Sequence, residues 1–327
     1  MVVEMSRLDD LRAAFECRQP QGGVPLWELE FHLWDEASGK HVVLGQEFQD
    51  LSAAEQERAL SSNAEIIVSV CREFGFAGLT PPGGLWEWAP GVLAYYVLPE
   101  QARWEQLRIL REMAPQDLML ISGSGGVIVP PSQGYEEFAY RLYDAPDEIE
   151  EMARQTRDRG IEAAKRLRDA GCGAVYAAAD IADNHGPYFT PAQMKRFVLP
   201  YMHEWAEGVR ALGLYAILHS DGNLTTVLDE LAESGLSALQ AIDPIAGMDI
   251  AAAKRQVRGR ICLCGNIDCG LLHFGPPAKV YETTTEALTN CKPGGGFVLG
   301  ASNAVFRETP IEHYREMIRA WRDHGRY

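Results

Sequence analysis

The feature that most limits how this chain can fold is the regular alternation of eight short apolar runs with segments of helical periodicity. The runs have the length and composition of buried strands. Repeated strand–helix units over 327 residues, with no linker between them, predict an α/β fold, a single (β/α)8 TIM barrel. The runs are residues 24–28, 75–80, 117–124, 174–179, 214–218, 238–241, 261–264 and 296–299. The alternative is an open doubly wound sheet, which needs no eighth unit and usually has a glycine fingerprint in its first turn.

Composition excludes several classes of protein. A net charge of −16 would repel nucleic acid, and no apolar run approaches the length of a membrane span. Seven cysteines without scaffold-like spacing indicate a reducing compartment, and the N-terminus lacks the apolar core of a signal peptide. We therefore expect a cytoplasmic protein, with one domain over residues 1–327 and an N-terminal helical extension.

The apolar run at residues 214–218 ends at His219-Ser-Asp-Gly-Asn223. It thereby brings an imidazole and a carboxylate, His219 and Asp221, to the C-terminal end of a strand. The alternative is a tight turn in which Asp221 or Asn223 caps the next helix.

Other strand ends bear polar groups as well, and in a barrel all of them would share one face. Ionisable groups on one rim repel one another unless they bind a cation or a polar substrate. The sequence therefore predicts an acidic pocket that contains histidine, with Asp180 in a substrate-binding or acid–base role. The residues at these ends are Glu28, Glu30, His32, Asp180, Asp183, His185, Asp243, Cys264, Asn266, Asp268, Ser302 and Asn303.

A zinc site is one use for this rim. His219 and Asp221, completed by Glu28, Glu30, His32 or Cys264, would supply nitrogen, oxygen and sulfur ligands with a position left open. No compact motif of the HExxH kind supports it, and the pattern around Cys264 favours a small buried core residue over a metal ligand. For substrate binding we expect Trp86 and Tyr96, from an aromatic-rich loop, with His185, Asn266 and Asn303.

Five segments together resemble the uroporphyrinogen decarboxylase superfamily, most closely its branch of corrinoid-dependent methyltransferases. They are residues 180–191 (Asp-Ile-Ala-Asp-Asn-His-Gly-Pro-Tyr-Phe-Thr-Pro), 197–201, 219–223, 265–268 and 293–296. The likeness is clear over residues 145–322 and weaker before them. It implies a (β/α)8 barrel, in agreement with the alternation of strands and helices.

Two departures from the family pattern bear on function. The decarboxylases carry an Arg-Gln-Ala-Gly-Arg segment after the first strand, whereas residues 27–32 here read Trp-Glu-Leu-Glu-Phe-His. The coenzyme M methyltransferases carry a His-x-Cys zinc site with a distant second cysteine. His219 matches that histidine, but Asp221 replaces the first cysteine, and Ala301 or Ser302 stands at the second. A harder, oxygen-rich site suits activation of an ether or alcohol oxygen better than activation of a thiol.

The resemblance leads us to expect a methyltransferase that moves a methyl group between a small substrate, with an aromatic methyl ether favoured, and a corrinoid on a partner protein. His219 and Asp221 would bind the metal or donate a proton, and Asp180 would orient the substrate. One alternative is a decarboxylase-like lyase that acts without metal through Asp180. Another is a non-catalytic barrel that docks a corrinoid protein. The oligomeric state, including a homodimer, is left open.

Overall fold

The computed structural model describes residues 6–83, 85–89, 92–95, 97–114, 118–131 and 133–327, with only the backbone described for 85–89 and 92–95. Its centre is a curled sheet of seven parallel strands, in which each strand pairs with the next one along the chain. The strands are β1 (Gly78–Leu79), β4 (Met119–Gly123), β5 (Ala174–Ala178), β8 (Tyr215–His219), β9 (Ala238–Ala241), β10 (Cys262–Ile267) and β11 (Phe297–Ala301). Because all are parallel, their C-terminal ends meet on one rim.

The expected eighth strand, residues 24–28, does not form, so the expectation of a closed eight-stranded barrel was wrong and the sheet is a TIM-like half-barrel. The segment runs between β11 and β1 but makes only isolated bridges. Leu299 N donates to Pro25 O over 2.9 Å, and Ala77 N donates to Leu26 O over 2.8 Å. Pro25 has no N–H to donate, which interrupts the ladder that a regular strand would require.

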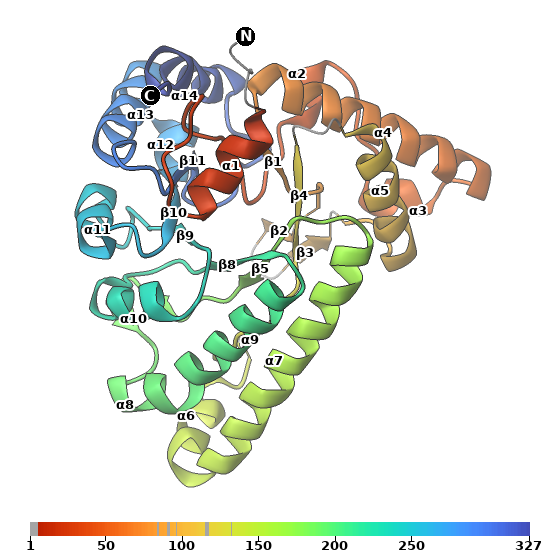
Figure 1. Cartoon of the computed structure of the whole chain (residues 1–327). Coiled ribbons are helices and arrows are strands. Elements are labelled where there is room, and N and C mark those ends of the chain that lie inside the picture. Colours follow the sequence, from red (N-terminus) through yellow and green to blue (C-terminus); the bar gives the residue numbers. More distant parts are fainter. Residues whose placement is uncertain (1–5, 84, 90–91, 96, 115–117, 132) are drawn as a thin grey trace.

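Helices surround the sheet on its outer side (Figure 1). Local signals in the sequence explain several of them: Ser52 and Glu55 form a capping box before α4, and Thr190 and Gln193 form another before α8. The longer helices are α4 (Ala53–Phe74), α5 (Glu100–Met113), α6 (Tyr135–Asp144), α7 (Pro146–Asp169), α9 (Leu199–Ala211), α11 (Ile250–Val257), α13 (Pro277–Cys291) and α14 (Ile311–His324). The shorter ones are α2 (Trp34–Ser38), α3 (Gly45–Gln49), α8 (Pro191–Gln193), α10 (Leu228–Glu233) and α12 (Cys269–Phe274). A π-helical stretch, Met194–Val198, joins α8 to α9.

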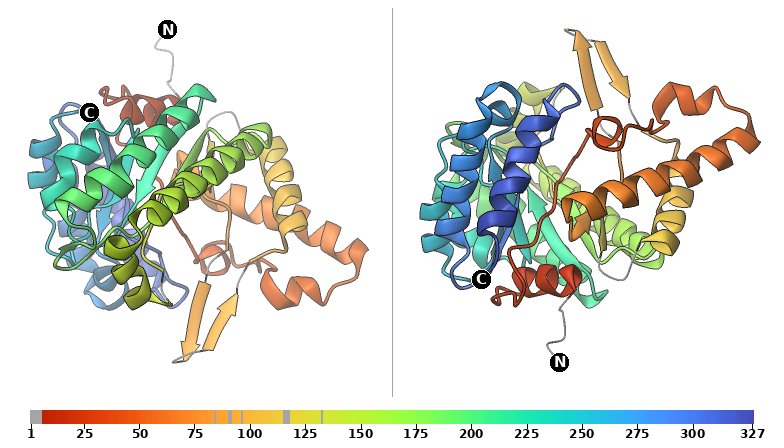
Figure 2. Two further views of the ribbon diagram at one scale, coloured as in Figure 1. Left: turned by 90° about the horizontal axis from the view of Figure 1, so that it is seen from below. Right: turned by 90° about the horizontal axis from the view of Figure 1, so that it is seen from above.

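The N-terminal helix α1 (Arg7–Phe15) lies across the N-terminal end of the half-barrel. Its Leu11 and Phe15 belong to the interior cluster that also contains Met119, Ile217 and Cys262. Figure 2 shows α1 at one end of the sheet and a hairpin projecting from the opposite end. That hairpin consists of β2 (Leu85–Ala89) and β3 (Val92–Tyr95), and a smaller one, β6 (Ala182–Asp183) with β7 (Gly186–Pro187), follows β5.

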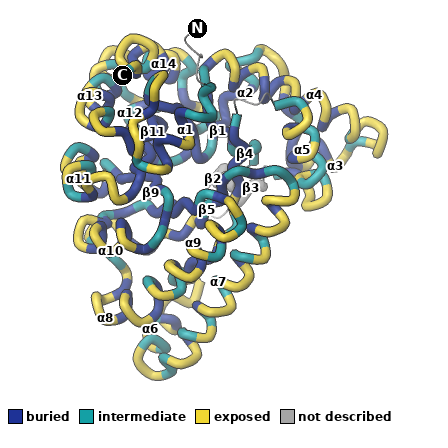
Figure 3. Tube along the Cα trace, in the orientation of Figure 1, coloured by how far each residue is buried: buried dark blue, intermediate teal, exposed yellow. Residues whose placement is uncertain are grey.

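Burial follows the same arrangement: the strands are buried, and the outward faces of the surrounding helices are exposed (Figure 3). Among the described residues, no helix combines the length and the apolar character needed to span a membrane.

Candidate functional site

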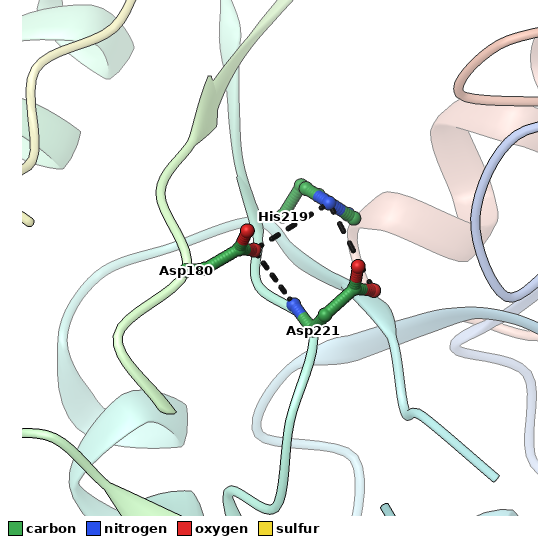
Figure 4. Close-up of side chains that lie close together, drawn as sticks. All are labelled: Asp180, His219 and Asp221. Carbon is green, nitrogen blue, oxygen red and sulfur yellow. Dashed lines mark hydrogen bonds and ion pairs between the residues drawn. The ribbon is translucent and has the colours of Figure 1, made fainter. Parts of the chain in front are cut away.

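Three side chains meet at the C-terminal rim, from the ends of the neighbouring strands β5 and β8 (Figure 4). His219 Nε2 lies 3.7 Å from Asp180 Oδ1 and 4.0 Å from Asp221 Oδ1. One potential ligand atom of each residue lies within 4.8 Å of the others. The backbone N–H of Asp221 also donates to Asp180 Oδ1 over 2.9 Å. This bond holds the Asp180 carboxylate against the loop that carries Asp221. The three residues predicted as catalytic thus form one cluster.

The loop that carries Asp221 is held by contacts to neighbouring loops and by Asn223, whose Oδ1 accepts a hydrogen bond from Thr225 N at the start of the next helical turn. Gly222 has a φ of 89°, and its N–H donates to Asp243 Oδ2 over 3.2 Å. Asn223 N donates to Asp183 O over 2.7 Å, which ties the loop to the β6–β7 hairpin. Asp243, Asp183 and Asn223 therefore shape the loop and do not enter the cluster.

His219 is buried, and its ring is oriented by Gln240 on the adjacent strand β9. His219 Nδ1 is hydrogen-bonded to Gln240 Oε1. The amide orientation of Gln240 is set independently, because its Nε2 donates to the carbonyls of Ala301 and Ser302, each over 3.2 Å. Gln240 Oε1 must therefore accept, so His219 carries a proton on Nδ1 and turns Nε2 toward the two carboxylates.

Asp221 is partly buried, and burial is the main reason why its pKa rises from 3.8 to about 6. The neighbouring carboxylates Asp180 and Asp243 raise the pKa further, whereas His219 and a hydrogen bond from Asn303 Nδ2 lower it. Asp180 is more open, with 54% of its side chain exposed. The two carboxylates therefore lie beside an imidazole nitrogen, and this arrangement can bind a cation or share a proton.

These three residues fit a divalent metal ion such as zinc. One imidazole nitrogen and two carboxylate oxygens form a common donor set for catalytic zinc, and the hydrogen bond at Nδ1 is the support that metal-bound histidines usually have. Separations of 3.7 and 4.0 Å are somewhat longer than those between two tetrahedral ligands about 2 Å from one ion, so a bound ion would draw the three side chains closer together. Three protein ligands leave a position for substrate.

The cluster opens into a cavity of about 720 Å³. Four acidic side chains line it: Glu30, Asp180, Asp221 and Glu308. Among the described residues that line it there is no lysine or arginine. The cavity is therefore suited to cations and neutral polar molecules, and it would repel a polyanion.

Two residues predicted as metal ligands lie outside the cluster, which corrects that part of the prediction. Glu28 is buried, and its carboxylate accepts hydrogen bonds from Ala301 N over 2.8 Å and Tyr314 Oη over 2.9 Å. Burial raises the pKa of Glu28 to about 8. Cys264 is packed in the apolar interior of the half-barrel together with Cys262. Both residues serve the structure of the strand ends instead.

Glu30, which was also predicted as a metal ligand, lines the cavity but does not belong to the cluster of three. Its carboxylate lies 3.2 Å from Nε2 of the buried His32, on the same segment. That contact orients the Glu30 side chain at the wall of the cavity.

Of the described residues predicted to bind substrate, one lines the cavity and two do not. Asn303 lines the cavity and donates to Asp221. Asn266 is buried and donates to Ile242 O over 2.9 Å, whereas the side chain of His185 is 94% exposed on the β6–β7 turn. Neither of them lines the cavity. Trp86 lies on β2, but its side chain falls outside the described structure, as does all of Tyr96.

Several residues of the site were not predicted. Gln240 could have been found, because it is a polar residue inside an otherwise apolar strand, in register with His219. His273 and Cys269 line the cavity from the short helix α12. No local pattern indicates that this helix turns toward the rim.

Comparisons with known proteins place the chain in a family. A family model described as uroporphyrinogen decarboxylase (URO-D) matches residues 104–324, which is more than half of the chain and confirms the resemblance. Over 153 residues, or 44% of the chain, it is 29% identical to uroporphyrinogen decarboxylases from Shigella dysenteriae serotype 1 (strain Sd197) and Escherichia coli O1:K1 / APEC. That stretch spans only 40% of those relatives. The fold is similar to that of a methyltransferase from Methanosarcina mazei, with a TM-score of 0.72 and 18% identity over 98% of this chain and 99% of that one. The chain belongs to the uroporphyrinogen decarboxylase family.

Proposed function

We propose that this protein is a methyltransferase that moves a methyl group from the oxygen of a small substrate, an aromatic methyl ether, to a reduced corrinoid carried by a separate protein. The observation that carries the proposal is the geometry in which Nε2 of His219 faces the carboxylates of Asp180 and Asp221 while Nδ1 is held by Gln240. Such a group of donors binds a divalent ion, and its oxygen-rich character favours an oxygen-centred substrate.

The chemical difficulty in this reaction is the leaving group. Transfer breaks the methyl–oxygen bond, leaves the bonding electron pair on oxygen and gives the methyl group to the nucleophilic corrinoid. A divalent ion held by His219, Asp180 and Asp221 would act as a Lewis acid on that oxygen. Gln240 keeps the imidazole in the binding tautomer, and Asn303 orients the Asp221 carboxylate through its hydrogen bond.

In an alternative mechanism without a bound ion, Asp221 supplies a proton to the departing oxygen. Its pKa of about 6 means that a fraction of the side chain is protonated near neutral pH, whereas an ordinary aspartic acid is almost fully ionised. General acid catalysis of this kind typically contributes ~10²–10⁴-fold. Both roles require the same placement of Asp221 beside His219.

Family membership favours a second candidate, decarboxylation of a porphyrinogen without metal. The substrate of such a reaction carries several carboxylates, and the cavity offers Glu30, Asp180, Asp221 and Glu308 with no cation among its described lining residues. Coulombic repulsion therefore counts against this candidate. The acidic segment at residues 27–32 counts against it as well.

The deciding experiment incubates the purified protein, with and without added zinc, with anisole and chemically reduced cobalamin. Formation of methylcobalamin is followed by its absorption spectrum. We expect zinc-dependent methylation that is lost in His219→Ala and Asp221→Ala. His185→Ala, whose side chain is exposed outside the cavity, serves as the matched control and should keep full activity.

Two results would contradict the proposal. Turnover of uroporphyrinogen without corrinoid would establish the decarboxylase instead. Methylation that is unchanged in the double variant of His219 and Asp221 would remove this rim from the mechanism and leave a protein that only docks its corrinoid partner.

A further inference from the structure

A second cavity opens at the same end of the sheet, between α5 and the C-terminal ends of β1, β4 and β5. Its volume is about 380 Å³, which is within the size range of sites for small molecules. It shares no lining residue with the acidic cavity. Much of its wall is apolar and is formed by Pro81, Pro82, Val97, Leu98 and Leu107.

One polar group at this cavity is a buried acceptor in need of a donor. Gln106 is 1% exposed, and its Nε2 donates to Leu60 O in α4 over 3.0 Å. That bond commits the amide nitrogen to the side of α4 and leaves Oε1 with no hydrogen-bond partner among the described residues. An unsatisfied buried carbonyl is costly, so a ligand hydroxyl that donates to Gln106 Oε1 would relieve that cost.

Two further groups at this cavity can bind an anion. Among the described residues that line the cavity, Arg103 is the only cation, and it forms no ion pair with another described residue. The Tyr176 hydroxyl makes no hydrogen bond to a described residue, and the Tyr176 ring lies so close to Gly123 that a Cβ there would be 3.2 Å from it. A guanidinium and a phenolic hydroxyl together suit a carboxylate.

Tyr176 also connects this cavity with the acidic one. Burial is the main cause that raises the pKa of its hydroxyl; the Glu30 carboxylate raises this pKa further, and Arg103 lowers it. Tyr176 therefore lies within electrostatic range of Glu30, in the wall of the first cavity, and of Arg103, in the wall of the second.

We propose that the second cavity binds a small aromatic carboxylate that also carries a hydroxyl group. The ring lies between the prolines and leucines, the carboxylate pairs with Arg103 and the Tyr176 hydroxyl, and the ligand hydroxyl donates to Gln106 Oε1. This inference deepens the proposed function, since the ligand is then the ring portion of the methyl donor. Only that identification rests on the methyl-transfer proposal.

Calorimetric titration of the full chain with 4-hydroxybenzoate tests the site without metal, corrinoid or turnover. We expect Arg103→Met to weaken binding at least tenfold and Tyr176→Phe to weaken it several-fold. Arg108→Met is the matched control, because Arg108 lies on the same helix but pairs with Glu105 and Glu112 outside this cavity. Its affinity should stay within twofold of the unmodified protein. Phenol, which lacks the carboxylate, should bind at least tenfold more weakly than 4-hydroxybenzoate, with no further loss in Arg103→Met.

Absence of binding at millimolar concentration would overturn the inference, as would equal affinity of the Arg103→Met and Arg108→Met variants. If the protein methylates cobalamin but does not bind 4-hydroxybenzoate, the second site is refuted and the proposed function stands. Retained binding in a protein without methyl transfer would leave the site standing and remove the proposed function.

Discussion

His219 and Gln240 are register partners on the neighbouring strands β8 and β9, and their side chains are joined by a hydrogen bond from His219 Nδ1 to Gln240 Oε1. The same glutamine donates to the carbonyls of Ala301 and Ser302 at the end of β11. The ring orientation of the candidate metal ligand is thus set by a residue that does not line the substrate cavity.

Replacing Gln240 should consequently weaken metal binding more than it alters the fold. In Gln240→Leu, His219 loses its acceptor, so both its tautomer and its ring orientation are no longer specified. Loss of such a supporting contact typically costs ~10–100-fold in metal affinity. Zinc dissociation constants measured by competition with a chelator would check this. Gln256→Leu is a suitable control, because Gln256 is half-buried on α11 and its side chain donates to Asp229, outside the cluster. Equal zinc affinity in the two variants would contradict the role of Gln240.

The stability of the metal-free protein should depend on the ionisation of Asp221. Its pKa is raised from 3.8 in the unfolded chain to about 6 in the folded protein. The stability it contributes is therefore fully present below about pH 4 and is lost as the pH rises through 6. In Asp221→Asn that loss disappears. We expect the variant to be more stable than the unmodified protein at pH 8 by on the order of 1 kcal/mol, after allowance for solvent screening, and equally stable at pH 4. Urea unfolding at the two pH values measures the difference, and a variant that is less stable at pH 8 would refute the argument.

Much of the fold could be predicted because seven of the strands are buried on both faces and therefore read as short apolar runs. The eighth run, at residues 24–28, has the same composition, but Pro25 lacks an N–H. The segment therefore makes only isolated bridges, with single bonds from Leu299 and Ala77, and no continuous ladder. Hydrophobicity alone does not report hydrogen-bond regularity, and Pro25 is the feature of the sequence that argues against a regular strand here.

The site was predictable as far as it depends on strand ends. His219, Asp180 and Asp221 follow parallel strands directly, and the topology brings them together. Glu28 follows a similar run, but it turns toward Tyr314 of α14, a partner far away in the sequence. Which way a side chain turns depends on such distant packing, which single-sequence patterns do not contain.

The structural role of Glu28 can be separated from metal binding. Tyr314→Phe removes one of the two donors to the buried Glu28 carboxyl and keeps the ring that packs on Phe31 and Phe74. We expect a loss of about 1–2 kcal/mol in the free energy of unfolding and unchanged zinc affinity. A zinc dissociation constant that rises tenfold would restore Glu28 as a contributor to the metal site.

The conformation of the loop after β8 should tolerate no side chain at Gly222. Its φ of 89° is unfavourable for other residues, and a Cβ there would lie 2.6 Å from the backbone of Ala182. Gly222→Ala should therefore shift the loop, separate Asp221 from Asp180 and lower both stability and zinc affinity. Gly213→Ala is the control, since Gly213 has a φ of 79° but nothing within 4 Å of its Cβ position, so it isolates backbone strain of roughly 1 kcal/mol. Denaturant unfolding and zinc titration of both variants give the comparison. The steric argument requires Gly222→Ala to be the more damaging by at least 1 kcal/mol, and equal losses would show that the contact with Ala182 yields without moving Asp221.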